Sequence, residues 1–116
     1  MSAKEPLCVQ IAALGGQGGG VLAEWLAEAA RHAGYPGQMT SIPGVAQRTG
    51  ATTYYFEMYP QADCPDKPVF CLSPDADGLD LMIAMEPLEA ARALENGLIT
   101  KRTTVLSATS RIYSMV

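Results

Sequence analysis

The chain has 116 residues, of which 48% are hydrophobic and 17% charged, so it can bury the core of one compact domain but hardly of two. Its 8 basic and 12 acidic residues give a net charge of −4, which argues against a nucleic-acid-binding protein and against a basic membrane-surface module. There is no apolar run of about 18 residues, as a membrane span requires, and residues 1–6 lack a secretory signal pattern. Three cysteines are an odd number for a disulfide framework, so a reducing cytoplasm is the expected location.

The first 34 residues predict a strand, a glycine turn and a helix. Residues 7–14 (LCVQIAAL) form an apolar run of strand length, as in strands buried on both faces. The run ends at residues 15–20, where five of six residues are glycine. Apolar residues then recur at helical spacing until Gly34, which is the expected glycine after the helix end. The stripe expected to face the core consists of Val21, Leu22, Trp25, Leu26, Ala29, Ala30 and Ala33.

The rest of the chain predicts short strands and one further helix. Residues 51–59, rich in aromatic and β-branched side chains, are the clearest later strand. Residues 80–85 have the composition of a buried strand, and Glu86 and Pro87 then begin a helix through about Glu95 with Gly97 as its stop. The remaining segments predict strands at 38–42, 69–72 and 103–108, a loop or single helical turn at 45–50, and a surface connection at 60–68.

This order of elements predicts an α/β fold, with a Rossmann-like open, mostly parallel sheet and flanking helices in one domain over residues 1–116. An α/β sheet normally carries helices on both faces, and two helices are few for five or six strands. We therefore expect either that the chain is a fragment of a larger polypeptide, incomplete at its C-terminus, or that a partner covers its sheet. A monomer without an exposed apolar patch would contradict this expectation.

The glycine turn is the main candidate for a binding site. Backbone N–H groups at a helix N-terminus accept phosphate, pyrophosphate or carboxylate groups, and glycines let such a ligand come close. Gly16 and Gly18 fit the G-x-G-x-x-G pattern, but Val21 stands at its third glycine. No acidic residue occurs between Glu28 and Glu57, where a dinucleotide site needs one for its ribose, and the G-x-x-x-x-G-K-[ST] pattern is missing. The turn is therefore either an anion site or only a place where strand and helix pack closely.

The loop that contains Gln47 and Arg48 is the second candidate. Arg48 is the only Lys or Arg between Arg31 and Lys67. We expect it near the carboxyl ends of the strands, beside the glycine turn, where open α/β sheets bind ligands. An arginine there could clamp a carboxylate or phosphate with two hydrogen bonds, whereas a solvated surface arginine is the simpler alternative. Gln47 would add a hydrogen bond to a ligand or cap the local turn.

The other polar residues predict neither a catalytic centre nor a metal site. Cys8 lies in a strand and is expected to be a small buried hydrophobic residue, while Cys64 and Cys71 lack the spacing of zinc or iron–sulfur ligands. His32, the only histidine, lies on the polar side of the first helix, which disfavours a Ser-His-Asp or Cys-His triad. The aspartates of residues 63–80, Asp80 included, are interpreted as solvated turn residues. We therefore assign no catalytic residue and expect the chain alone to be inactive.

Two segments in tandem resemble a known family and cover, with two later segments, most of the chain. Residues 11–23 (IAALGGQGGGVLA) are similar to the opening of the gamma-type domain of 2-oxoacid:ferredoxin oxidoreductases. Residues 41–52 (SIPGVAQRTGAT) resemble a loop typical of indolepyruvate:ferredoxin oxidoreductase beta subunits. Residues 80–90 and 107–113 fit the same family in order. The family's domain continues beyond the equivalent of Val116, in line with an N-terminal fragment.

The resemblance implies a subunit of an enzyme that oxidatively decarboxylates an aryl 2-oxoacid such as indolepyruvate, giving an acyl-coenzyme A, carbon dioxide and reduced ferredoxin. In that family, thiamine diphosphate and iron–sulfur clusters are carried mainly by a large partner subunit, and the gamma-type domain helps to shape the substrate or coenzyme A side of the active site. The implied ligand or interface contacts are Gly15, Gly16, Gln17, Gly18, Gly19, Gln47 and Arg48. The family has two glycines after its arginine, whereas here Thr49 precedes Gly50, and its side chain would narrow the approach of a ligand.

Two other functions stay open at this point. The chain could be a free-standing α/β module that binds a nucleotide or coenzyme A without catalytic activity, or a domain that only mediates assembly. The expected partners are the large thiamine- and cluster-bearing subunit, ferredoxin through that subunit, a small 2-oxoacid, and a second copy of the chain in a homodimer. Neither nucleic acid nor a membrane is expected as a partner.

Overall fold

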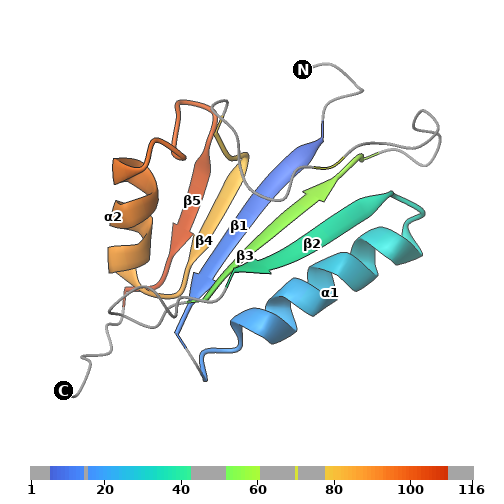
Figure 1. Cartoon of the computed structure of the whole chain (residues 1–116), viewed down its shortest axis with the longest axis horizontal. Helices are drawn as coiled ribbons and strands as arrows, with labels where there is room; N and C mark the ends of the chain where they lie inside the picture. Colours follow the sequence, from blue (N-terminus) through green and yellow to red (C-terminus); the bar gives the residue numbers. More distant parts are fainter. Residues whose placement is uncertain (1–5, 15, 43–51, 61–69, 71–77, 110–116) are drawn as a thin grey trace.

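The protein forms one five-stranded sheet in the order β2-β3-β1-β4-β5, with helices beside it (Figure 1). The computed structural model describes residues 6–14, 16–42, 52–60, 70 and 78–109. The elements are β1 (Leu7–Ala13), α1 (Gly19–His32), β2 (Gly37–Ile42), β3 (Thr52–Met58), β4 (Leu81–Ala84), α2 (Pro87–Glu95) and β5 (Thr104–Ser107). The predicted α/β class is confirmed, and each of these elements lies where the sequence places it, to within one or two residues.

Four of the five strands run in the same direction, and β3 alone runs against them (Figure 1). β1 pairs in parallel with β4, and β4 with β5, whereas β3 is antiparallel to both β1 and β2. The connection between β2 and β3 is shorter than the dozen or so residues that a parallel crossover needs. The mostly parallel sheet is therefore confirmed, with one antiparallel strand inserted beside its centre.

Helix α1 packs on one face of the sheet with a different side from the predicted one. Of the predicted stripe, Leu22, Leu26 and Ala30 do pack on the sheet, together with Ala23 and Ala27. The other members of the stripe, Val21, Trp25, Ala29 and Ala33, are exposed. The helix turns its small residues toward the sheet because the strands beneath it already present large side chains, chiefly Met39, Tyr54 and Phe56. Residues 21, 25 and 29 consequently form a second apolar row that is exposed.

Helix α2 lies on the opposite face, over β4 and β5. Side chains alternate along a strand, so Cys8, Ala12 and Met82 point to this face and pack with Ala93 of α2, whereas Val9 and Ile11 point to α1. The predicted ends of the helix are confirmed, with Pro87 in its first turn and Gly97 at φ 77° after it. The two helices thus cover different parts of opposite faces.

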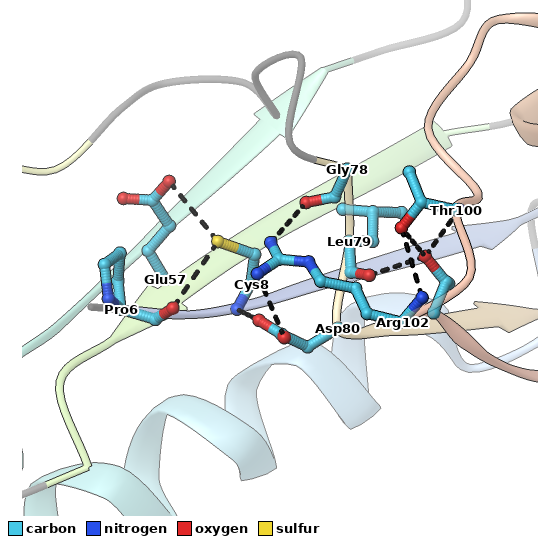
Figure 2. A network of polar contacts seen from close by, with 9 residues as sticks. Pro6, Cys8, Glu57, Gly78, Leu79, Asp80, Thr100 and Arg102 are labelled. Carbon is cyan, nitrogen blue, oxygen red and sulfur yellow. Dashed lines mark hydrogen bonds and ion pairs between the residues drawn. The ribbon is translucent and has the colours of Figure 1, made fainter. Parts of the chain in front are cut away.

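Asp80 joins the amino ends of the parallel strands (Figure 2). Its Oδ2 accepts a hydrogen bond of 2.8 Å from the Cys8 amide, its backbone N–H donates to the Cys8 carbonyl, and its carbonyl accepts from the Thr104 amide. Arg102 Nη1 lies 3.7 Å from Asp80 Oδ1, and Arg102 Nη2 donates to the Gly78 carbonyl. The interpretation of Asp80 as a solvated turn residue was wrong. Its carboxylate accepts the hydrogen bond of the Cys8 backbone amide at the start of β1, where a carbonyl of a neighbouring strand would otherwise accept it.

Replacing Asp80 with alanine should lower the free energy of unfolding by about 1–3 kcal/mol, because the part-buried Cys8 amide loses its acceptor. Urea denaturation measures the change. Asp80→Asn retains an acceptor oxygen for the amide and should cost clearly less. Equal losses in the two variants would show that the charge beside Arg102 matters more than the hydrogen bond to Cys8.

Candidate functional site

The carboxyl ends of β1 and β4 form the switch point of this sheet. β1 leads into α1 on one face, whereas the neighbouring parallel strand β4 leads into α2 on the other face. In Figure 1, the turn before α1 and the start of α2 lie at the same end of the sheet. Open α/β sheets bind ligands in the crevice outside this point, because the two connections diverge there. The fold therefore defines an α/β protein with a candidate ligand site at the turn after β1.

The glycine turn leaves the first amides of α1 without partners inside the helix. Gly16 and Gly18 have φ values of 84° and 79°, and Gln17 N–H closes the turn on the Leu14 carbonyl at 3.2 Å. The first helical hydrogen bond runs from Leu22 N–H to the Gly18 carbonyl, so the amides of residues 19–21 have no helical acceptor. Among the described residues, no side chain caps them, and the first turn carries no acidic residue. This end of the helix can therefore accept a negatively charged group.

The glycines of the turn serve two different purposes. A Cβ on Gly19 would lie 2.6 Å from Ala13 Cβ and 3.3 Å from a ring carbon of Tyr54, so this glycine permits close packing of α1 on the sheet. A Cβ on Gly16 or Gly18 would meet nothing within 4 Å, and these two positions require glycine for their positive φ instead. Both are exposed. Close packing of strand and helix, one of the two roles expected for these glycines, therefore explains Gly19. Gly16 and Gly18, in the turn itself, stay open to solvent.

A pocket of about 240 Å³ lies against the turn, with Thr52 and Tyr54 on its far side. The Tyr54 hydroxyl is 3.1 Å from the place where a Cβ on Gly20 would stand. Sequence reasoning missed both residues because it interpreted residues 51–59 only as a strand. The alternation of that strand could have identified them, since residues 52 and 54 share one face and Thr52 pairs with Ala13 just before the turn.

The side chain of Gln17 points across the switch point. Its Oε1 accepts a hydrogen bond of 2.7 Å from the Leu14 amide, and its Nε2 donates one of 2.9 Å to Glu86 Oε1. Glu86 directly precedes α2 and is only 5% exposed. The sequence interpretation gave Glu86 no role beyond the start of a helix, because the contact joins two distant parts of the chain.

Three of the predicted site residues, Gly15, Gln47 and Arg48, lie outside the described residues. The two ends of their loop are described: Ile42 pairs with Thr53, and Thr52 pairs with Ala13. Both ends therefore lie at the edge of the sheet that carries the glycine turn, where the loop was predicted to lie. The predicted strand at 69–72 is described only at Phe70, which belongs to no strand, and Cys64 and Cys71 lie outside as well.

The described residues suit an anionic ligand better than a metal ion or cluster. Among them, no group of three or more His, Cys, Asp or Glu residues could hold a metal. Cys8 is buried as predicted, and burial raises the pKa of its thiol, which disfavours the thiolate that binds metals. Neither described helix is both long enough and apolar enough to cross a membrane. A carboxylate or phosphate, by contrast, fits the uncapped amides of the glycine turn.

Comparison with known proteins identifies the family. Residues 8–112 match the profile of the pyruvate ferredoxin/flavodoxin oxidoreductase family, and the chain belongs to this family. No curated protein sequence matches the chain.

Two solved structures share the fold. The 2-oxoglutarate:ferredoxin oxidoreductase from Magnetococcus marinus, solved with 2-oxoglutarate, coenzyme A and succinyl-coenzyme A bound, aligns with a TM-score of 0.71 and 15% identity over 97% of this chain. The pyruvate oxidoreductase subunit PORC from Thermotoga maritima aligns with a TM-score of 0.64 and 22% identity over 95% of this chain. The chain spans 18% of the Magnetococcus chain and 53% of the Thermotoga chain.

Proposed function

We propose that the chain works as a subunit, or part of a subunit, of a 2-oxoacid:ferredoxin oxidoreductase, and that its glycine turn binds an anionic group of the 2-oxoacid or of coenzyme A. The observation that carries the proposal is the row of uncapped amides of residues 19–21 on an open turn at the switch point. Both molecules carry the carboxylate or phosphate groups that such a helix end accepts. Family membership over residues 8–112 supports the same reaction class.

The finer assignment rests on the resemblance of residues 41–52 to indolepyruvate:ferredoxin oxidoreductases. It makes an aryl 2-oxoacid such as indolepyruvate the substrate, with Gln47 and Arg48 beside the glycine turn. Thiamine diphosphate and the iron–sulfur clusters would then belong to the large partner subunit and supply the decarboxylation and electron transfer there. This chain, as one gamma-type domain in a reducing cytoplasm, would bind and orient the anionic groups.

An exposed apolar surface supports the need for a partner. β4 and β5 carry α2 on one face only, and on the other face Ile83 pairs with Leu106, which is 55% exposed. On α1, Trp25 is 68% exposed and Val21 50%. A groove of about 280 Å³ between α1 and the sheet is lined almost entirely by apolar side chains, among them Leu26 and Leu81. Parallel strands are normally covered on both faces, so we assign this surface to the large subunit.

Replacing Trp25 with serine tests this assignment. We expect that co-expression with the large subunit yields a complex containing thiamine diphosphate and iron, and that Trp25→Ser lowers its recovery about tenfold, since buried tryptophans dominate interfaces. The melting temperature of the chain alone should stay within about 1 °C of the wild-type value, because the Trp25 side chain is mostly exposed. His32→Ser, on the polar side of α1, is the matched control and should leave the recovery unchanged.

Other outcomes would favour the alternative functions. A homodimer without thiamine diphosphate or iron, with coenzyme A affinity that Gly18→Val abolishes, would indicate a free-standing binding module. A complex whose kinetics are unchanged in Arg48→Ala and in Gly18→Val, but whose assembly fails in Trp25→Ser, would indicate a domain that only mediates assembly.

A further inference from the structure

Gln17 is the residue through which the two connections at the switch point touch each other. Its side chain accepts from the Leu14 amide at the end of β1 and donates to Glu86 at the start of α2. The two side chains are 69 positions apart in the sequence. Of the residues in the turn, Gln17 is also the one with a side chain, since its neighbours 15, 16, 18, 19 and 20 are all glycine.

The chemistry of the contact fixes which way the Gln17 amide points. The Leu14 N–H can only donate, so the atom that faces it is the Gln17 oxygen. The amide nitrogen consequently faces Glu86 and donates to its Oε1. A residue at position 17 must therefore accept at one atom and donate at another. Lysine cannot accept, methionine cannot donate, and glutamate would face Glu86 with a second carboxyl group.

The contact determines where the free amides of α1 lie relative to α2. The exposed positions of the turn, Gly16 and Gly18, contribute no side-chain contacts that would hold it in place. The backbone around Glu86, by contrast, is held by hydrogen bonds. The preceding Met85 amide donates to the Ala12 carbonyl of β1, and the Glu86 carbonyl accepts from the Glu89 amide in the first turn of α2. The hydrogen bond from Gln17 to Glu86 therefore restricts the movement of the glycine turn relative to α2.

We propose that Gln17 is a positioning residue: it touches no ligand itself, but it holds the glycine turn against the start of α2 and so fixes the amides of residues 19–21 for an anion. A displacement of Glu86 or α2 is then transmitted to the anion site. The role as an anion site rests on the proposed function, whereas the coupling between turn and α2 can be tested without any ligand.

An exchange of the two side chains tests the coupling in the full chain. In Gln17→Glu two carboxyl groups face each other, and in Glu86→Gln a side-chain amide replaces the carboxyl group that accepts from Gln17. In the double variant Gln17→Glu/Glu86→Gln, the new carboxyl group at position 17 accepts from the Leu14 amide as before and also from the new side-chain amide at position 86. Both hydrogen bonds are then present, with the direction of the one between positions 17 and 86 reversed. Glu95→Gln, at the exposed end of α2, is the control for the loss of one charge from the helix.

Hydrogen exchange of individual amides is the first measurement. We expect the amides of Leu14 and residues 16–21 to exchange about tenfold faster in each single variant and to return toward the wild-type rate in the double variant. The amides of Ile11 and Met82, in the fully buried centre of the sheet, report global unfolding and should change less. Unchanged exchange in both single variants, or a double variant that is as fast as they are, would overturn the proposal.

The second measurement is the binding of coenzyme A to four proteins: wild type, the two single variants Gln17→Glu and Glu86→Gln, and the double variant. The proposal requires an affinity that falls in both single variants and recovers in the double variant, which general damage to the fold would not produce. An affinity that is equal in all four proteins would overturn the positioning role. If the wild-type chain, alone and in its complex, binds neither coenzyme A nor a 2-oxoacid while exchange follows the expected pattern, the anion-binding part of the proposed function fails and the coupling of turn and α2 stands.

Discussion

Replacing Gly19 with valine is expected to lower the free energy of unfolding by about 3 kcal/mol. The Cβ alone would lie 2.6 Å from Ala13 Cβ, a distance that two carbon atoms do not adopt without a shift of the backbone. Ala13 is 2% exposed at the end of the central strand, and Tyr54 closes the other side at 3.3 Å. Neither neighbour is the flexible end of a long side chain, so α1 itself would have to move off the sheet. Urea denaturation of the full chain measures the loss.

Gly16→Ala is the matched control for this prediction. The added methyl group meets nothing within 4 Å, and its cost is the strain of a positive φ of 84°, about 1–2 kcal/mol. Gly19→Val should therefore be the more damaging change, although both replace a glycine of the same turn. The opposite order would mean that α1 can shift without loss, and that the close approach between Gly19 and Ala13 does not stabilise the fold.

Local patterns in the sequence were sufficient to predict most elements of the fold. The strand at residues 7–14, the glycine turn and the helix after it were predicted because the chemistry that defines them lies within a few residues. Gly34 and Gly97 both adopt a positive φ after their helices, as the sequence indicated. The place of Ile42 beside the glycine turn was predicted for a related reason, since β2 and β1 run in the same direction and their carboxyl ends meet at one edge of the sheet. The place of Thr52 was not predicted, because it is the first residue of β3 and lies at this edge only because β3 is antiparallel.

What the sequence could not indicate depends on pairings between distant segments. The hydrogen bond from Gln17 to Glu86 follows from the register of β1 with β4, in which Ala12 lies opposite Ala84. The role of Asp80 depends on the same register, since its carboxylate serves the amide of a strand that is 72 positions away. The side of α1 that faces the sheet was predicted in part wrongly, because an apolar row at 21, 25 and 29 indicates burial without telling whether the sheet or a partner provides it.

We expect a second large effect, a loss of stability at alkaline pH, from the buried polar side chains of Cys8, Tyr55 and Glu57 at the amino end of β1. Cys8 and Glu57 lie opposite each other on β1 and β3, and Cys8 Sγ is 3.9 Å from Glu57 Oε2 (Figure 2). The Tyr55 hydroxyl donates to the same carboxylate oxygen. All three residues are more than nine-tenths buried. Burial raises the pKa of the Tyr55 hydroxyl far above 10.0, aided by the neighbouring Cys8 and by the hydrogen bond to Glu57, and burial also raises the pKa of the Cys8 thiol above 9.0.

The direction of the effect follows from these two shifts. Both groups are neutral when protonated, and in the folded state both keep their protons at a pH where the unfolded chain releases them. Their stabilising contribution is therefore complete below about pH 8.5 and is lost as the pH rises above the pKa values of the unfolded chain. Each group can lower the free energy of unfolding by at most about 1.4 kcal/mol for every further pH unit. Denaturation series at about pH 8, 9.5 and 11 should show a loss that becomes steeper above pH 10.

Tyr55→Phe separates this titration from general alkaline damage. At about pH 8 the variant should be less stable than wild type by about 1–3 kcal/mol, because Glu57 loses a buried donor. Above pH 10, however, its stability should fall less steeply, since the hydroxyl that the folded state keeps protonated is gone. Cys8→Ala should remove the earlier part of the decline, which begins near pH 9. A Tyr55→Phe variant that is less stable at every pH by the same amount would contradict the prediction, because only a difference in slope shows that the folded protein holds this proton more tightly than the unfolded chain.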